Sequence, residues 1–262
     1  MQKLATVLCV LAAVAYDVHG KSIQRRNTKT LKTGTTWSLQ AWGYEDELKG
    51  EMVDVDLSTT TEDEIKKLSD AGHTVICYYS AGTAESWRPD YLELMDYSSG
   101  KSKYDDEWWL DLTEWKGFAP SMAARMANAA EKGCHGVEAD NFDCYGYGDD
   151  CKQGYSVSEL LVLEKEYFKW SADTAHNLGL LFGLKNALDM IDDLFDVIDF
   201  GINESCSLYQ EWNECGHYQK FAKANKAVFG VEWQGNGECA EKYNNGIMGK
   251  YKKSGAEQWK NC

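Results

Sequence analysis

Gly136-Val137-Glu138-Ala139-Asp140-Asn141 is a short apolar segment that ends abruptly in polar residues. It is typical of a buried β-strand, in which alternate side chains point to opposite faces. Glu138 and Asp140 therefore share one face of the strand, and Val137 and Ala139 share the other. Two carboxylates on one buried face are costly unless they are paired or functional. The segment indicates either a structural carboxylate pair or part of a catalytic site.

Similar segments recur along the chain and alternate with helical patterns. Expected strands cover residues 37–42, 52–57, 74–80, 136–141, 180–184, 197–202, 227–231 and 246–248, and expected helices cover 62–72, 121–132, 156–177, 188–195 and 216–224. A long loop is expected at 81–111. Strands that alternate with helices predict βαβ units around a parallel sheet. Seven or eight such units favour an α/β fold, a (β/α)8 TIM barrel in a single domain with disulfide-stapled loops.

The N-terminus has the composition of a secretory signal peptide. Met1 to Lys3 is basic, and Leu4 to Tyr16 is apolar but too short to span a bilayer. We therefore expect a signal peptide over 1–20, a flexible basic segment over 21–34 and the barrel domain over 35–262. The mature protein is expected to be secreted and extracellular, without a membrane segment.

Cysteine usage agrees with an oxidising compartment. The chain has nine cysteines, and loss of Cys9 with the signal peptide leaves an even number, which predicts disulfides. No paired CxxC or HxxxH spacing suggests a zinc site, so no metal is expected. Spacing alone does not determine the connectivity. Candidate pairs are Cys144–Cys151, Cys206–Cys215 and Cys239–Cys262.

Polar residues finish nearly every expected strand. In a parallel barrel these strand ends meet on one face, which carries the chemistry, so the pattern predicts a ring of polar groups around one pocket. Paired carboxylates with flanking aromatic residues are what glycoside hydrolysis requires. The sequence has no metalloprotease His motif, nucleophile elbow or P-loop. The strand-end residues are Gln40, Asp56, Tyr79 with Ser80, Asp140 with Asn141, Lys185 with Asn186, Glu204 and Glu232.

The formal net charge is −15, from 42 acidic and 27 basic residues. Such a protein repels nucleic acids and anionic membranes and attracts cationic ligands. We expect a monomer with neither a nucleic acid nor a membrane as partner.

Short motifs throughout the expected mature chain occur in the order found in one known family. They are Trp37–Gln40, Val53–Asp56, Val75–Gly82, Glu85–Asp90, Trp108–Asp111, Met122 with Arg125, Gly133–Asn141, Gly183–Ala187, Asn203–Cys206, Glu214–Cys215 and Val231–Glu232. In these motifs the chain resembles glycoside hydrolase family 114, the endo-α-1,4-polygalactosaminidases. The family usually has Pro where this chain has Ala139, and Gly where it has Cys144.

The resemblance implies a (β/α)8 barrel that cleaves internal α-1,4 bonds in galactosamine-containing polysaccharide, without a metal or other cofactor. The catalytic carboxylates of the family fall on Asp140 and Glu204, which we assign as nucleophile and acid/base, with the order of the two roles left open. The same scaffold could act on a different polysaccharide. The protein could also be an inactive secreted carbohydrate-binding barrel, which would be expected to lack one carboxylate.

A cationic amino-sugar polysaccharide is the expected partner, because acidic subsites would attract it. Alternatively, Asp56 and Glu138 are buried partners of Lys185 or Arg125, and Trp109 packs in the core instead of holding a sugar. Arg88 and Asp90 are expected to form a salt bridge, and Asn203, in a glycosylation sequon, to be buried and unmodified. The expected substrate-binding residues are Gln40, Asp56, Tyr79, Trp109, Glu138, Asn141, Asp143, Lys185, Asn186 and Glu232.

Overall fold

The computed structural model describes residues 30–40, 48–147, 151, 154–207, 213–232, 246–251 and 260–261 of the 262-residue chain. The expected signal peptide and residues 21–29 of the expected basic segment lie outside these ranges. None of the helices in the described ranges has the length and apolar composition that a membrane span requires.

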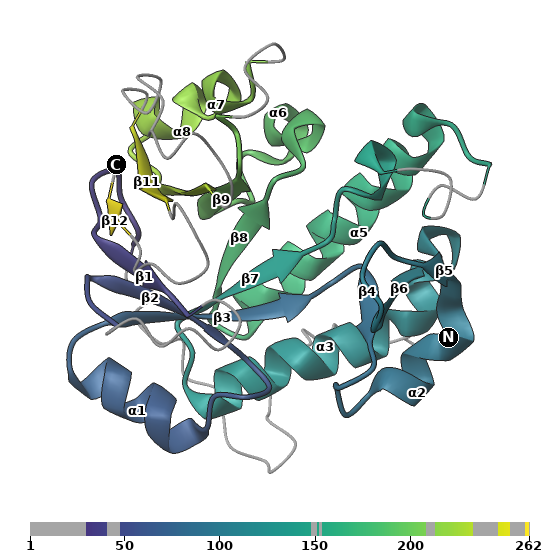
Figure 1. Cartoon of the computed structure of the whole chain (residues 1–262), viewed down its shortest axis with the longest axis horizontal. Coiled ribbons are helices and arrows are strands. Elements are labelled where there is room, and N and C mark those ends of the chain that lie inside the picture. Colours follow the sequence, from purple (N-terminus) through teal and green to yellow (C-terminus); the bar gives the residue numbers. More distant parts are fainter. Residues whose placement is uncertain are drawn as a thin grey trace, which may run out of the picture.

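The described strands form a nearly closed barrel of eight parallel strands (Figure 1). Trp37 Nε1 on the first strand donates a 2.9 Å hydrogen bond to the carbonyl oxygen of Met248 on the last parallel strand, which joins the two edges. The expected single-domain (β/α)8 barrel is confirmed. In spatial order the parallel strands are β1 (Trp37–Leu39), β2 (Met52–Asp56), β3 (Thr74–Ser80), β7 (Gly136–Asp140), β8 (Leu181–Lys185), β9 (Phe200–Glu204), β10 (Val228–Glu232) and β11 (Ile247–Tyr251), and β12 (Lys260–Asn261) is antiparallel to β11.

Two of the helices between the strands, which begin at Glu62 and Val157, start directly after capping residues. Thr61 with Glu64 and Ser156 with Glu159 form capping boxes, which satisfy free N–H groups at the two helix starts. The third long helix begins at Trp115 instead of at the expected Ser121. The helices are α1 (Glu62–Asp70), α3 (Trp115–Lys132), α5 (Val157–Asn177), α6 (Ile191–Leu194), α7 (Glu214–His217) and α8 (Gln219–Lys223), with 3₁₀ turns η2 (Leu112–Glu114), η3 (Cys144–Gly146) and η4 (Leu188–Met190).

The segment between β3 and α3 is not only a loop, as the sequence suggested, but contains a small antiparallel sheet. Its strands are too short to show a clear alternation, and cross-strand pairing in the order β4-β6-β5 stabilises them. Figure 1 shows this insertion at the end of β3. It comprises β4 (Thr83–Glu85), α2 (Tyr91–Leu94), η1 (Met95–Tyr97), β5 (Ser98–Lys101) and β6 (Glu107–Leu110).

Strand alternation divides the apolar core into two clusters. One cluster lies inside the barrel and includes Met52, Ile76, Leu181 and Phe200, which sit near the starts of their strands. The other fills the layer between the sheet and its helices. Residues two and four positions further along each strand share the inner face, so polar side chains at the strand ends stand above an apolar floor.

Three disulfides are formed among the described cysteines: Cys77–Cys134, Cys144–Cys151 and Cys206–Cys215. The two expected loop pairs are confirmed, and the Cys239–Cys262 candidate lies outside the described residues. Cys77–Cys134 ties β3 to the end of α3. The other two close the loops that follow β7 and β9.

Glu164 on α5 is fully buried beneath the loop that follows β7. Its Oε1 accepts a 3.2 Å hydrogen bond from the backbone N–H of Tyr145, and its Oε2 has no partner among the described residues. Burial raises the pKa of this carboxyl to about 9. The group therefore folds in its neutral form.

We expect the stability of the protein to fall as the pH rises from 5 to 9, and Glu164→Gln to weaken this dependence. The carboxyl of Glu164 ionises near pH 4.5 in the unfolded chain and near pH 9 in the folded protein. Its contribution to the free energy of unfolding is therefore complete below pH 4.5 and is lost progressively as the pH rises to 9. The loss is about 1.4 kcal/mol per pH unit. Urea unfolding at several pH values measures it. Glu166→Gln, on the exposed face of the same helix, is the control; equal slopes in both variants would contradict the assignment.

Candidate active site

Lys185, the last residue of β8, is a buried lysine whose ammonium contacts carboxylates from two neighbouring strands. Its Nζ lies 2.9 Å from Glu138 Oε1, 3.4 Å from Asp140 Oδ2 and 3.3 Å from Glu204 Oε1. The contacted oxygens of Asp140 and Glu204 therefore lie within about 7 Å of each other, a separation suited to paired carboxylates that act on one glycosidic bond. The structure brings together the two carboxylates expected to be catalytic.

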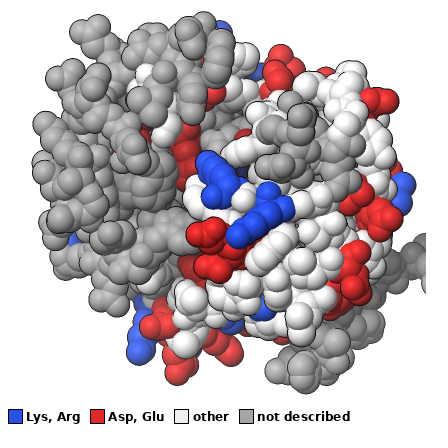
Figure 2. Space-filling view, turned by 45° about the vertical axis from the view of Figure 1, so that its right-hand side comes forward, with Lys and Arg blue, Asp and Glu red and all other residues white. Residues whose placement is uncertain are grey.

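The lysine and its three carboxylate partners differ in how exposed they are. Glu138 and Lys185 are 2% and 4% exposed, whereas the side chains of Asp140 and Glu204 are 20% and 35% exposed. Asp140 and Glu204 end β7 and β9, on either side of β8, at the carboxyl-end face of the barrel. Figure 2 shows basic and acidic side chains next to one another on one face of the molecule.

The electrostatics of the group follow from burial and mutual contact. Burial, together with the charges of Glu204 and Glu138, raises the pKa of Asp140 to about 6, although Lys185 opposes the rise. Burial alone would lower the pKa of Lys185, but the surrounding carboxylates raise it well above its usual range. The lysine is therefore cationic at neutral pH, and Asp140 exchanges its proton near neutrality.

Arg88 anchors the insertion to the barrel. Its guanidinium donates to both oxygens of Asp56 at 2.9 and 2.7 Å and to both oxygens of Glu85 at 2.6 and 3.1 Å. Although burial opposes the effect, these hydrogen bonds hold the pKa of Asp56 below its usual range. The expected Arg88–Asp90 salt bridge is wrong: Asp90 pairs with Arg125 instead, at 2.7 and 2.8 Å.

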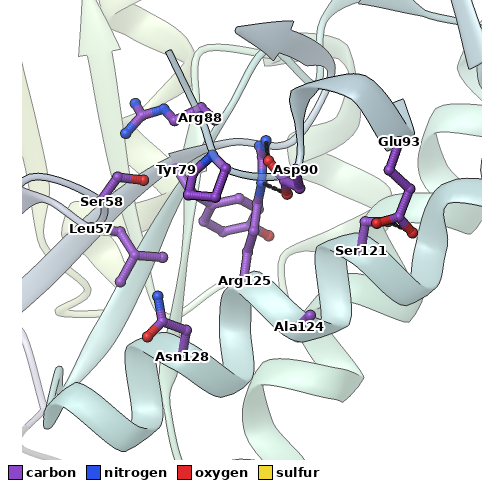
Figure 3. A pocket seen from close by; sticks show the side chains of 11 residues that line it. Leu57, Ser58, Tyr79, Arg88, Asp90, Glu93, Ser121, Ala124, Arg125 and Asn128 are labelled. Atoms are coloured by element: carbon purple, nitrogen blue, oxygen red, sulfur yellow. Dashed lines mark hydrogen bonds and ion pairs between the residues drawn. The ribbon is translucent and has the colours of Figure 1, made fainter. Parts of the chain in front are cut away.

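The structure does not place Tyr79 with the carboxylates, as its position at a strand end suggested. Tyr79 lies in the outer core cluster and lines a cavity of about 200 Å3 on the outer side of the barrel, beside Arg125 (Figure 3). Its neighbour Tyr78 has the opposite orientation. Burial and the nearby charge of Asp140 raise the pKa of Tyr78. The alternation of β3 therefore places Tyr78, and not Tyr79, on the side of the carboxylates.

Two asparagines turn the chain at the strand ends. Asn141 and Asn186 have φ values of +66° and +51°, in the left-handed region that asparagine tolerates. Asn141 Nδ2 donates to Ser80 Oγ at 2.9 Å, and Asn186 Oδ1 accepts the backbone N–H of Glu204 at 2.8 Å. Asn186 thus positions the backbone of the second carboxylate.

Asp143 is an ionisable neighbour of Asp140, whereas Trp109 packs behind the site. Burial and the charge of Asp140 raise the pKa of Asp143 to about 7. Trp109 is only 5% exposed and packs against the ring of Tyr147 at 4.8 Å. The pKa of Tyr147 is raised by burial and by the charges of Asp143, Asp140 and Glu204. Trp109 therefore supports the site through Tyr147.

The remaining expected residues lie at the edge of this group. Glu232 is buried, and its Oε1 accepts the backbone N–H of Ser207 in the loop that follows Glu204, at 3.1 Å. Gln40 follows β1, and its backbone N–H donates to the carbonyl of Asp54. Asn203 is 1% exposed, so its expected burial is confirmed. Its Oδ1 accepts a hydrogen bond from the backbone N–H of Cys206.

Several ionisable members of the site were not predicted from the sequence. Asp54 lies in an alternating strand two positions before Asp56, a signal that was present but not used. Glu85 and Glu107 come from the insertion, which the sequence did not reveal as a sheet; burial, Glu85 and Asp140 raise the pKa of Glu107 to about 7. The carboxyl groups of the described site are Asp54, Asp56, Glu85, Glu107, Glu138, Asp140, Asp143 and Glu204.

These carboxyl groups outnumber the cations Arg88 and Lys185, so the described part of the site is strongly acidic. No group of three or more His, Cys, Asp or Glu side chains within the described ranges is arranged to hold a metal ion. The carboxyl groups of the site can perform acid–base and nucleophilic chemistry, in contact with a cationic ligand.

Comparisons with known proteins relate the whole chain to one family. The model of Glycoside-hydrolase family GH114 matches residues 20–260. Aspergillus fumigatus Ega3, solved in complex with galactosamine, superposes with a TM-score of 0.75 at 27% sequence identity, covering 90% of this chain and 100% of that chain. The glycoside hydrolase domain of PelA from Pseudomonas aeruginosa shares the fold, with a TM-score of 0.65 at 13% identity and coverage of 83% and 94%. No curated protein matches the chain. Since the family model spans nearly the whole sequence, the resemblance is confirmed: the chain belongs to glycoside-hydrolase family GH114 and is a glycoside hydrolase.

Proposed function

We propose that the protein is a secreted endo-glycosidase that hydrolyses α-1,4 bonds in galactosamine-containing polysaccharide, with Asp140 and Glu204 as its catalytic residues. The observation that carries the proposal is the contact of both carboxylates with Lys185 Nζ at the accessible end of the barrel. Family membership and the galactosamine complex of Ega3 support the choice of substrate.

In the proposed reaction, an Asp140 oxygen attacks the anomeric carbon while the carboxylic acid of Glu204 protonates the departing glycosidic oxygen. The C–O bond to the leaving sugar breaks, and an ester bond to Asp140 forms. Glu204, now ionised, accepts a proton from a water molecule that attacks the same carbon and releases Asp140. The Asp140 and Glu204 oxygens that contact Lys185 lie less than about 7 Å apart. This limit is compatible with the roughly 5–5.5 Å that separates the two carboxyl groups in glycosidases with a carboxylate nucleophile.

The acidic character of the site supports a substrate with free amino groups. Such a polymer is a polycation, and an excess of carboxyl groups in a partly enclosed site raises its local concentration. We propose that Asp143 contributes to ammonium recognition, because it is a carboxyl beside Asp140 that forms no salt bridge with the described residues. The proposal also includes a signal peptide over residues 1–20 and a catalytic domain over residues 35–262.

Asp140→Asn and Glu204→Gln are each expected to lower the rate on galactosaminan by roughly 10³-fold or more, because each removes a group that acts in the transition state. The roles are separated with an aryl glycoside whose leaving group needs no proton. Glu204→Gln should retain the step that releases the aryl group, and Asp140→Asn should not. Circular dichroism verifies folding, and near-normal hydrolysis by a folded Asp140→Asn variant would refute its role.

The pH dependence of kcat/KM should have an acidic limb. Asp140 must be ionised to attack, and its pKa is raised to about 6, so activity should fall as the pH decreases through this value. Initial rates between pH 4 and 8, with the fold monitored at each pH, measure the limb. A rate that stays constant down to pH 4 would exclude an essential Asp140 carboxylate with this pKa.

Deacetylated galactosaminan should be cleaved at least about tenfold faster than the fully N-acetylated polymer at low ionic strength, because only the former is attracted by the acidic site. The advantage should shrink as salt is added, and it should shrink in Asp143→Asn relative to the wild-type enzyme. Chromatography of released oligosaccharides gives the rates. If the acetylated polymer were cleaved faster, the proposed preference for a cationic substrate would be wrong.

A further inference from the structure

Asn141 follows Asp140 in the chain, and its main chain and side chain make two different hydrogen bonds. The backbone N–H of Asn141 donates to Asp140 Oδ1 at 2.9 Å. The side-chain Nδ2 of Asn141 donates to Ser80 Oγ, at the end of the neighbouring strand β3, also at 2.9 Å. Asn141 therefore links the proposed catalytic carboxylate to β3.

The peptide unit between Asp140 and Asn141 has a fixed orientation. Its carbonyl oxygen accepts a 2.8 Å hydrogen bond from the backbone N–H of Ala81, which follows β3. The C=O and N–H groups of a trans peptide point in opposite directions, so the N–H of Asn141 points away from β3, towards the side of β8. There the carboxylate of Asp140 contacts this N–H through Oδ1, while Oδ2 lies 3.4 Å from Lys185 Nζ.

The hydroxyl of Ser80 is a fully occupied anchor for the side chain of Asn141. It accepts from Asn141 Nδ2 and, at 3.1 Å, from the backbone N–H of Thr83, which uses both of its lone pairs. Its own proton is therefore donated to Thr83 Oγ1, 2.6 Å away. Ser80 and Thr83 are both 0% exposed, so neither hydroxyl can contact a polysaccharide.

Asn141 adopts a φ of +66°, a left-handed conformation that residues with a side chain adopt only at a cost. The segment that contains Ser80 is packed around this conformation. A Cβ atom on Gly82 would lie 1.9 Å from the carbonyl oxygen of Asn141. Arg125 Nη1 donates to the carbonyl oxygen of Ser80 at 2.5 Å. The anchor is therefore itself held in place.

We propose that Asn141 is a positioning residue for Asp140 and not the substrate-binding residue that its place in the sequence suggested. Its side chain, held by Ser80, maintains the left-handed turn, and its backbone N–H holds Oδ1 of Asp140. Oδ2 is then the oxygen that faces the glycosidic bond, since it shares Lys185 Nζ with Glu204. The consequence for catalysis rests on the proposed function of Asp140.

The first test does not depend on hydrolysis. The chain has a single Asp-Asn sequence, Asp140-Asn141, so ¹³C-carbonyl aspartate combined with ¹⁵N-asparagine gives one carbonyl-coupled amide signal in NMR spectra, that of Asn141. An N–H that donates to a carboxylate forms a strong hydrogen bond, which moves its proton downfield. This proton should move upfield in Ser80→Ala, and an unchanged signal would overturn the proposal.

Ser121→Ala is the matched control for that measurement. Ser121 is also buried, and its Oγ donates to Glu93 Oε1 at 3.0 Å on the outer side of the barrel. Loss of this hydroxyl should leave the Asn141 amide signal in place. An equal upfield shift in both variants would show that the effect is not specific to Ser80, and the proposal would fail.

The second test measures kcat and KM on deacetylated galactosaminan. Asn141→Gly keeps a backbone suited to the left-handed turn but removes the anchored side chain. We expect kcat to fall about 10- to 100-fold, as misplacement of a reacting group does, with KM nearly unchanged. A rise in KM with an unchanged kcat would indicate a substrate contact and would overturn the proposal.

A double-mutant cycle then tests whether Asn141 acts through Ser80. Ser80→Ala should reproduce the loss in kcat, and the double variant Ser80→Ala/Asn141→Gly should be no slower than the slower single variant, because both changes break one link. Thr83→Ser, which keeps the hydroxyl, should retain a near-normal kcat, whereas Thr83→Val should resemble Ser80→Ala. Losses that multiply in the double variant would contradict the proposal.

Circular dichroism verifies the fold of each variant, and Thr83→Val replaces Ser80→Ala in both tests if the latter does not fold. A folded Ser80→Ala variant with the full wild-type kcat would overturn the proposal. Absence of hydrolysis by the wild-type protein would instead refute the proposed function, and the amide signal of Asn141 would still show whether Ser80 holds the turn at Asp140.

Discussion

A buried ammonium is the constraint on which the site depends. Lys185 is inside the barrel, where a charge without partners would be very costly, and its contacts are the carboxylates of Glu138, Asp140 and Glu204. Removing one partner of a buried ion pair typically costs about 3–5 kcal/mol. The requirement to surround this cation therefore fixes the ends of β7, β8 and β9 relative to one another, and with them the distance between the proposed catalytic groups.

The chain around these strand ends is built to hold that geometry. Asn141 and Asn186 adopt left-handed conformations directly after Asp140 and Lys185, so the backbone changes direction where these strands end. Gly82 allows a further close approach, because a Cβ atom there would lie 1.9 Å from the carbonyl oxygen of Asn141. Disulfides then close the loops that follow β7 and β9. These local devices suit a site in which small displacements would change both charge and reactivity.

Members of this site could be predicted where a strand has an apolar run that ends in polar residues, because the alternation of side chains then shows which residues share a face. The common face of Glu138 and Asp140 and the positions of Lys185 and Glu204 followed from periodicity and from the family motifs. Tyr79 was misassigned because the last residues of a strand point to opposite faces, and the inner face of β3 belongs to Tyr78. The partners of Arg88 could not be predicted, since Asp56 lies 32 positions away in sequence and meets it only through the folded insertion.

Depth below the surface provides a physical explanation for why similar carboxyl groups would perform different tasks. Asp54 is completely enclosed, so ionisation is prohibitive and the neutral acid is its stable form. Glu138 is also enclosed, but its Oε1 lies 2.9 Å from the ammonium of Lys185. Asp140 and Glu204 contact the same cation from more exposed positions, where water and substrate reach them. The more exposed pair is therefore the pair that a ligand can contact, and in the proposed mechanism one of its members, Glu204, gives up and regains a proton in each catalytic cycle.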